Sequence, residues 1–152
     1  MRRSEREKGK GFALGVLRDS EYATLATVNS DGTPYCIPIS QVLINETIYF
    51  HCATEGQKLD NIKQKDTVCI SCVSYTKLIP ENFSTQYESA VVTGKCEIVT
   101  DDSEKIKALM AICEKYAKSN MSNAEAAISK SLHRTCVCKI TISRISGKTN
   151  AK

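Results

Sequence analysis

Short β-prone segments, each ended by a turn signal, dominate the first half of the chain and constrain its fold most strongly. Ala23–Val28 alternates apolar and polar residues, and Asn29–Pro34 follows with an Asp-Gly pair suited to a tight turn with positive φ. A second strand is predicted over Tyr35–Ile44. After an Asn-Glu reversal, a third is predicted over Thr47–Cys52. Strands joined in this way form a β-meander.

Three further strands complete the predicted set: Thr67–Tyr75, Gln86–Thr100 with a bulge or bend at Gly94, and Thr135 to about Ile145. The segment Thr76–Thr85 contains Pro80 and reads as a loop. Six strands with peripheral helices favour a mainly β (α+β) antiparallel barrel, closed or split, over an open parallel sheet. We expect one domain over residues 1–152, with residues 1–10 and 147–152 flexible.

Helices are predicted at four places: over Phe12–Leu17, from a Thr54 cap to about Lys65, behind an Asp101 cap as far as Tyr116, and from Ser122–Glu125 onward. Thr54 and Gln57 match a capping box, in which the first side chain caps the helix and the second reaches back to it.

The composition of the chain argues against nucleic-acid and membrane partners. The net charge of +4 is mild and spread along the chain, and there are no Trp and only three Phe residues. A nucleic-acid binder more often has a concentrated basic stripe with aromatic residues for base stacking, so no nucleic-acid partner is expected. No apolar run approaches the roughly 20 residues that span a bilayer, and the charged N-terminus lacks the apolar stretch of a signal peptide. We therefore expect a cytoplasmic protein without a membrane partner.

Eight cysteines allow disulfides, a metal site or plain core positions. A reducing cytosol disfavours disulfides. Cys69 and Cys72 have the spacing of a zinc knuckle, but they lie in a predicted strand that would point them to opposite faces. Cys136 and Cys138 share an apolar face. We expect most of the cysteines to be core residues and predict no metal site.

The junction between the third strand and the following helix carries the clearest chemical signal. A helix start offers free amides and the positive end of the helix dipole, which suit a phosphate. Gly56 permits close backbone approach, and Lys58 adds a positive charge. The residues alone therefore mark a candidate anion site, with an exposed lysine in an ordinary first turn as the alternative.

At these segments the chain resembles the FMN-binding split barrels related to pyridoxamine 5′-phosphate oxidase, and more closely their nitroimidazole-resistance (Nim-like) branch. The resemblance lies in Leu25–Thr27, Asp31–Pro38, Ile48–Ala53, Gly56–Lys58, Ser89–Ile98 and Ile142–Lys148. It spans nearly the whole chain, with the segments in the family's order.

The resemblance implies a homodimer with FMN at the subunit interface. Lys58 matches the phosphate-binding lysine of the family, and Gly56 lies beside it. The other implied flavin contacts are His51, Cys52 and Ala53 at a strand end, Cys36, Ile37, Pro38, Ile39 and Ser40 along the isoalloxazine ring, and Ser89. Pro38 also removes a ladder donor, which leaves irregular backbone for a ligand.

One departure limits the transfer of function. The oxidase branch has an arginine immediately before the lysine, and this chain has Gln57. The substrate-binding arginines of the oxidase also have no evident counterparts, so pyridoxamine phosphate oxidation is not expected. His51 is the one candidate catalytic residue, as a proton donor; the alternatives are a flavin contact and a structural hydrogen bond. No motif involves His133.

Two functions follow from the resemblance. The first is an FMN-dependent oxidoreductase that reduces a small molecule such as a nitro compound, with NADH or NADPH binding transiently against the flavin. The second is a flavin carrier or electron-transfer protein without its own substrate, favoured by the scarcity of catalytic side chains. A metal-binding regulator that uses the cysteines is the third.

Overall fold

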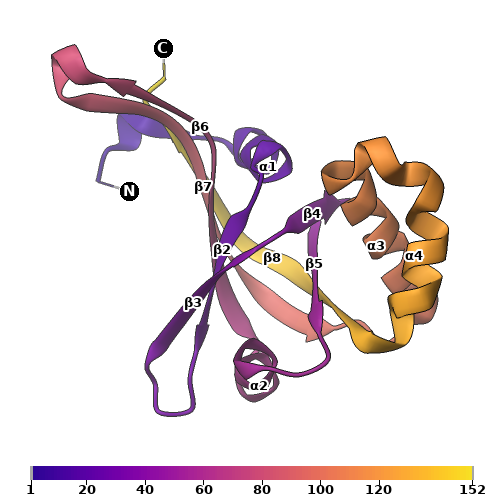
Figure 1. Cartoon of the computed structure of the whole chain (residues 1–152). Coiled ribbons are helices and arrows are strands. Elements are labelled where there is room, and N and C mark those ends of the chain that lie inside the picture. Colours follow the sequence, from indigo (N-terminus) through magenta and orange to yellow (C-terminus); the bar gives the residue numbers. More distant parts are fainter. Residues whose placement is uncertain (1, 152) are drawn as a thin grey trace.

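The computed structural model describes residues 2–151 and folds them around one antiparallel sheet of eight strands (Figure 1). The strands are β1 (Glu7–Lys8), β2 (Ala23–Val28), β3 (Pro34–Ile39), β4 (Gln41–Ile44), β5 (Thr47–Ala53), β6 (Thr67–Ile79), β7 (Ser84–Ile98) and β8 (Thr135–Thr149). The helices are α1 (Lys10–Asp19), α2 (Gln57–Gln64), α3 (Asp102–Tyr116) and α4 (Ala124–Ser131), with 3-10 turns at Ser4–Arg6, Pro80–Asn82, Lys118–Asn123 and Leu132–Arg134. The strand order is β3-β2-β6-β7-β8-β5-β4, and β1 pairs with β8.

The sheet curls into a split barrel because its two end strands are covalent neighbours. β3 and β4 lie at opposite ends of the strand order, yet only Ser40 separates them in the chain. One residue spans at most about 3.6 Å, so the sheet must bend until its two edges meet there. Away from Ser40 the two strands diverge and leave the barrel open (Figure 1). The predicted mainly β split-barrel fold is confirmed.

The strand count is eight rather than the predicted six. The strand predicted over Tyr35–Ile44 is interrupted at Ser40, where the chain passes from one edge of the sheet to the other. Near the N-terminus, Glu7 and Lys8 add a two-residue strand by pairing with Lys148 and Gly147.

The interior of the barrel is filled by the inward-facing side chains of the central strands. Leu25, Ile48, Phe50, Ile70 and Ile140 are fully buried. Burial of each such side chain contributes about 1.5–3 kcal/mol to stability. α1 covers one end of this core with its own apolar face, Ala13, Val16 and Leu17.

α3 and α4 pack on the outer face of β5 and β8, at the right in Figure 1. Asp101 caps α3 as predicted: its Oδ1 accepts a hydrogen bond from the Glu104 amide at 2.7 Å. The Tyr49 hydroxyl donates to the Glu104 carboxylate at 2.8 Å, and Lys139 forms an ion pair with it at 3.3 Å. These contacts attach the helical pair to β5 and β8. Among residues 2–151, no helix is both long and apolar enough to cross a bilayer.

The predicted loop over Thr76–Thr85 is instead the tip of a long hairpin. β6 continues to Ile79, a short turn at Pro80–Asn82 follows, and β7 begins at Ser84. Pro80 terminates the strand rather than interrupting it, because the turn does not require its missing N–H. The hairpin projects from the barrel at the upper left of Figure 1.

Two predicted helix caps are wrong. α2 is capped by Gly56, with φ of 131°, and not by Thr54. A glycine at this φ turns the chain into the helix where another residue would be strained. The helix predicted from Ser122–Glu125 starts as a 3-10 turn, and α4 begins at Ala124 without a side-chain cap.

The last strand is longer than predicted and bulged. β8 runs through Thr149, so residues 147–149 of the segment expected to be flexible lie in the sheet, while Lys152 lies outside the described residues. The predicted irregularity at Gly94 is confirmed: Thr93 pairs with Arg144 but Gly94 pairs with Ile142, which leaves Ser143 as the extra residue. A Cβ on Gly94 would lie 2.4 Å from the Thr141 carbonyl oxygen.

α2 is fastened to the β2–β3 turn by a buried amide. The Asn61 side-chain amide donates to Thr27 Oγ1 at 3.0 Å and to Asn29 Oδ1 at 2.8 Å. Gln57 Nε2 donates to the same Asn29 oxygen at 2.9 Å. α2 is therefore held across the lower end of the barrel, between the β2–β3 hairpin and the end of β5 (Figure 1).

Gly94→Ala is expected to lower the free energy of unfolding by about 3 kcal/mol or more, because the added methyl meets the backbone of β8. Gly15→Ala in α1 is the control, since its nearest neighbour is the flexible end of Arg18 at 3.7 Å. This control is expected to gain about 0.5–1 kcal/mol through helix propensity. Urea unfolding measures both variants, and equal stabilities would contradict the close approach.

Asn61→Ala is expected to lower the free energy of unfolding by about 1–3 kcal/mol, because two acceptors lose a buried donor. Gln57→Ala removes an exposed donor to one of these acceptors and is expected to cost less than about 0.5 kcal/mol. Hydrogen exchange of the α2 amides should rise only in the Asn61 variant. Equal losses of stability in the two variants would contradict the prediction that the hydrogen bonds of the buried Asn61 side chain contribute more than the exposed one of Gln57.

Candidate functional site

The end of β5 presents the predicted residues on two faces. His51 and Ala53 are exposed on the outer face, whereas Cys52 points toward the barrel interior. A hydrogen bond with Cys138 and partial burial raise the pKa of the Cys52 thiol, so it stays protonated at neutral pH. Only His51 and Ala53 can therefore meet a ligand on the outer surface.

The start of α2 has the donors expected for an anion site. The Gly56 carbonyl accepts the amides of Leu59 at 2.8 Å and Asp60 at 3.3 Å, which leaves the amides of Gln57 and Lys58 at the free end of the helix. Apart from its two chain neighbours, no residue in the described range 2–151 has an atom within 4 Å of where a Cβ on Gly56 would be, so the backbone is open there.

The charge at this helix start comes from Lys58. The ion pairs in the described part of the chain involve other cationic residues, so no carboxylate neutralises Lys58 directly. Glu55 and Asp60 flank it in the sequence and moderate the local potential. One lysine and two free amides can bind a single phosphate group.

Gln57, which stands where the oxidase branch has arginine, has a structural role. Its side chain is occupied by the hydrogen bond to Asn29. It therefore helps to position the helix, together with Asn61. Sequence reasoning did not identify Asn29 or Asn61, because their contact depends on how α2 packs against the β2–β3 turn.

His51 is a neutral imidazole at physiological pH. Although the side chain is exposed on one side, the surrounding protein removes part of the water around the ring, and this desolvation lowers the pKa of His51 below its usual 6.5. Because the unfolded chain binds the proton more readily, stability falls as pH decreases below about 6.5. Within residues 2–151 the ring makes no hydrogen bond, so the structural role considered from sequence has no support in the described contacts.

β3 runs from the α2 end of the barrel to the opposite end. Its first residue, Pro34, pairs with Val28 next to Asn29, and its last, Ile39, pairs with Ala23. Cys36 and Pro38 face outward and are exposed, while Ile39 is buried and Ile37 half-buried. The predicted ring-binding segment, Cys36 to Ser40, covers about 13 Å of this strand. It ends beside Gln41, which pairs with Phe50 of β5.

Ser89 is separated from the other predicted residues within one chain. It pairs with Val73 on β6 and lies on β7, three strands from β3. At about 4.8 Å per strand, this is roughly 14 Å around the sheet. Its hydroxyl donates to the Lys148 carbonyl at 3.4 Å.

A cavity of about 600 Å³ opens at Ser40 and includes side chains that sequence reasoning missed. Lys115 and Tyr116 of α3 line it, and both donate to the Gln41 carbonyl, at 3.0 and 2.8 Å. Burial lowers the pKa of Lys115 below its usual 10.5. Arg18 at the end of α1 contributes a second cation. No local sequence motif predicts this cavity, because it forms where three elements meet.

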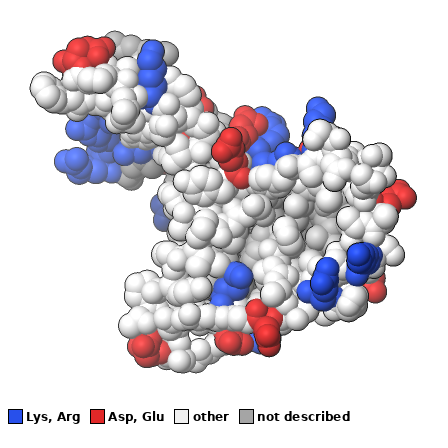
Figure 2. Space-filling view, in the orientation of Figure 1, with Lys and Arg blue, Asp and Glu red and all other residues white. Residues whose placement is uncertain are grey.

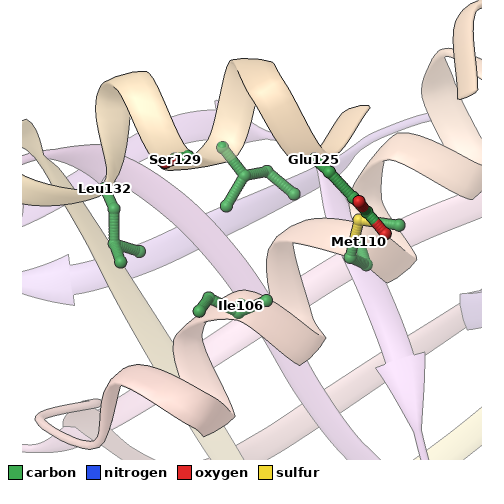
Figure 3. Close-up of a pocket in the computed structure, with 6 residues that line it drawn as sticks. Ile106, Met110, Glu125, Ser129 and Leu132 are labelled. Carbon is green, nitrogen blue, oxygen red and sulfur yellow. The ribbon is translucent and has the colours of Figure 1, made fainter. Parts of the chain in front are cut away.

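A second, apolar pocket lies between α3 and α4 (Figure 3). It measures about 340 Å³ and is lined by Ile106, Met110, Glu125, Ile128, Ser129 and Leu132. None of the predicted flavin residues line it. On the face shown in Figure 2, charged side chains gather at the periphery, and the hollow between helices and sheet is mostly uncharged.

Structural comparison places known proteins on the same fold. A candidate 5-nitroimidazole antibiotic resistance protein from Bacteroides thetaiotaomicron superposes with a TM-score of 0.78 and 26% identity, covering 93% of this chain and 84% of that protein. A FAD- and heme-binding protein from Mycobacterium smegmatis gives 0.83 and 20%, covering 97% and 74%. A flavocytochrome from Azotobacter vinelandii gives 0.76 and 16%, covering 100% and 72%.

Sequence comparison identifies the family directly. No curated protein sequence matches the chain. The family model described as pyridoxamine 5′-phosphate oxidase matches residues 13–149, which is nearly the full length. Together with the split-barrel topology, this match shows that the chain belongs to the pyridoxamine 5′-phosphate oxidase family.

Proposed function

We propose that the chain binds FMN and serves as an oxidoreductase for a small molecule such as a nitro compound. The observation that carries the proposal is the junction of β5 and α2, where Lys58 and two free amides meet an open glycine backbone. This donor set matches a terminal phosphate monoester. FMN ends in such a group, whereas riboflavin has none.

The path of β3 supports the same ligand. A flavin anchored by its phosphate at Lys58 would have the outward positions of β3, Cys36 and Pro38, exposed for contact with its ring. Pro38 has no N–H, so the ring would meet an edge with few competing donors. We place the substrate in the cavity at Ser40, where the β3 segment ends.

We also propose a homodimer, which the exposure of this surface supports. The predicted flavin residues of one chain lie largely exposed and do not enclose a ligand alone, and Ser89 lies about 14 Å around the sheet from β3. We propose that a second copy completes the enclosure and that its Ser89 is among the groups it brings. A nicotinamide donor, NADH or NADPH, would bind transiently against the ring.

In this proposal the protein binds and orients the flavin, and the flavin carries the redox chemistry. When bound, FMN would supply the two-electron chemistry, and the chain would orient it and exclude water. We assign His51 to the phosphate end, as a neutral hydrogen-bond donor, because it lies two residues before the end of β5, on the exposed face of the strand that leads to α2. This role replaces the catalytic proton donor considered from sequence. With Gln57 in place of arginine, vitamin phosphate oxidation is not proposed.

A flavin carrier without its own substrate is the second candidate. The observation that favours it is that the exposed face of β3 consists of Pro34, Cys36 and Pro38, with no carboxylate, imidazole or amine among them. The likeness to a candidate nitroimidazole-resistance protein favours the reductase. Kinetics separate the two functions.

Lys58→Ala is expected to weaken FMN binding by about 10–100-fold, because a charge-assisted phosphate contact is lost. Riboflavin binding should be unchanged. Lys63→Ala, in the last turn of the same helix, is the matched control and should bind FMN like the wild type. Quenching of flavin fluorescence measures all of these affinities. An unchanged FMN affinity in the Lys58 variant would refute the phosphate site.

The reductase proposal predicts that the reduced flavoprotein passes electrons to a 5-nitroimidazole faster than free reduced FMN does. After anaerobic reduction with NADH or NADPH, stopped-flow absorbance should follow reoxidation, and product analysis should find the reduced nitro group. A rate no higher than that of free reduced FMN would favour the carrier instead.

A further inference from the structure

Three cysteines from two strands meet on the inner side of the β5–β8 ladder. Antiparallel register places Cys52 directly opposite Cys136, and Cys138 lies two residues further along the same face of β8. The three sulfur atoms all lie within 4.8 Å of one another. Sequence reasoning treated Cys136 and Cys138 as core residues and Cys52 as a flavin contact, because only the register brings the three together.

The triangle has nearly the size of a thiolate metal site. Three sulfurs on a cation at about 2.3 Å each lie about 3.8 Å apart in tetrahedral geometry. The sulfurs must therefore approach by at most about 1 Å, within the reach of a χ1 adjustment. Cys52 is half-buried and can make that adjustment, while Cys136 and Cys138 are held in the core.

The donor set selects the cation. It contains only sulfur, which excludes the hard cations Mg²⁺ and Ca²⁺ and favours a thiophilic d¹⁰ ion. Three thiolates around a divalent ion leave a net charge of −1, whereas three around a monovalent ion leave −2. Because burying a charge costs free energy, the divalent ion is favoured at this partly buried site. The half-buried side at Cys52 leaves room for a fourth ligand.

We propose that Cys52, Cys136 and Cys138 form a binding site for Zn²⁺, open at the Cys52 side. Each thiol gives up its proton to solvent as the ion binds, and no electron transfer is involved. The site is separate from the proposed flavin surface, since it uses the inner face of β5 and His51 uses the outer one. The proposed Zn²⁺ site can therefore be tested independently of flavin binding.

The test uses the full chain, free of any affinity tag and kept reduced with a phosphine, with Zn²⁺ and Cd²⁺ as probes. The wild type should bind one ion per chain. Cd²⁺ should produce a sulfur-to-metal charge-transfer band, and Zn²⁺ should raise Tm because it binds the folded state. Cu⁺ displacing Zn²⁺ would leave the thiolate site intact and support it.

Two variants locate the site. Cys52→Ser, at a half-buried position that tolerates a polar group, should lose affinity by at least about tenfold, and Cys138→Ala should do the same. Cys113→Ser is the matched control, a half-buried cysteine on α3 outside the triangle, and should bind like the wild type. Circular dichroism checks that each variant is folded.

The proposal fails if folded Cys52→Ser keeps the wild-type affinity and charge-transfer band, or if Cys113→Ser loses as much affinity. It also fails if the isolated protein, before any reductant is added, has two fewer titratable thiols and a peptide cross-link between Cys52 and Cys136. That result would assign the pair to a disulfide.

Discussion

The connection through Ser40 is the constraint on which the rest of the structure depends. A single residue joins the two ends of the strand order, so the sheet must curl until its edges meet at that point, and within residues 2–151 β3 and β4 do not pair beyond it. The edges are pinned at one point and separate below it. The opening that results has β3 on one side and the end of β5 on the other, and α2 lies across its lower end. Every candidate contact at the β5–α2 junction is placed by this geometry.

A single amide oxygen then sets how α2 lies in that opening. Asn29 Oδ1 accepts from both Asn61 and Gln57, one contact part-buried and one exposed. A glutamine is long enough to reach this oxygen and uncharged, so it adds a tether where an arginine would add positive charge. The chain therefore has a firmly placed helix start with a single cation, Lys58, beside its free amides.

Most strands could be predicted from the sequence because alternation of apolar and polar residues is local. The Asp101 cap and the irregularity at Gly94 were predictable for the same reason. The break at Ser40 was not, since both flanking segments have β-prone sequences and only the sheet topology separates them. The Thr54 cap was wrong because the positive φ at Gly56 starts the helix two residues later. Of the candidate site, the strand end and helix start were found from sequence. The Ser40 cavity and the cysteine triangle were not, because each joins segments far apart in the chain.

The two prolines of β3 have a further consequence for how this molecule meets others. β3 is an end strand, and positions 34, 36 and 38 direct their backbone nitrogens to the same side. Proline is tolerated in a strand where that side is the free edge, so only Cys36 offers a hydrogen there. If a strand of another chain paired with the free edge of β3, most of the carbonyl groups of that added strand would have no N–H donor on β3. The edge is thus protected against aggregation by strand addition. Any second chain must approach this part of the barrel through side-chain surfaces rather than by backbone pairing.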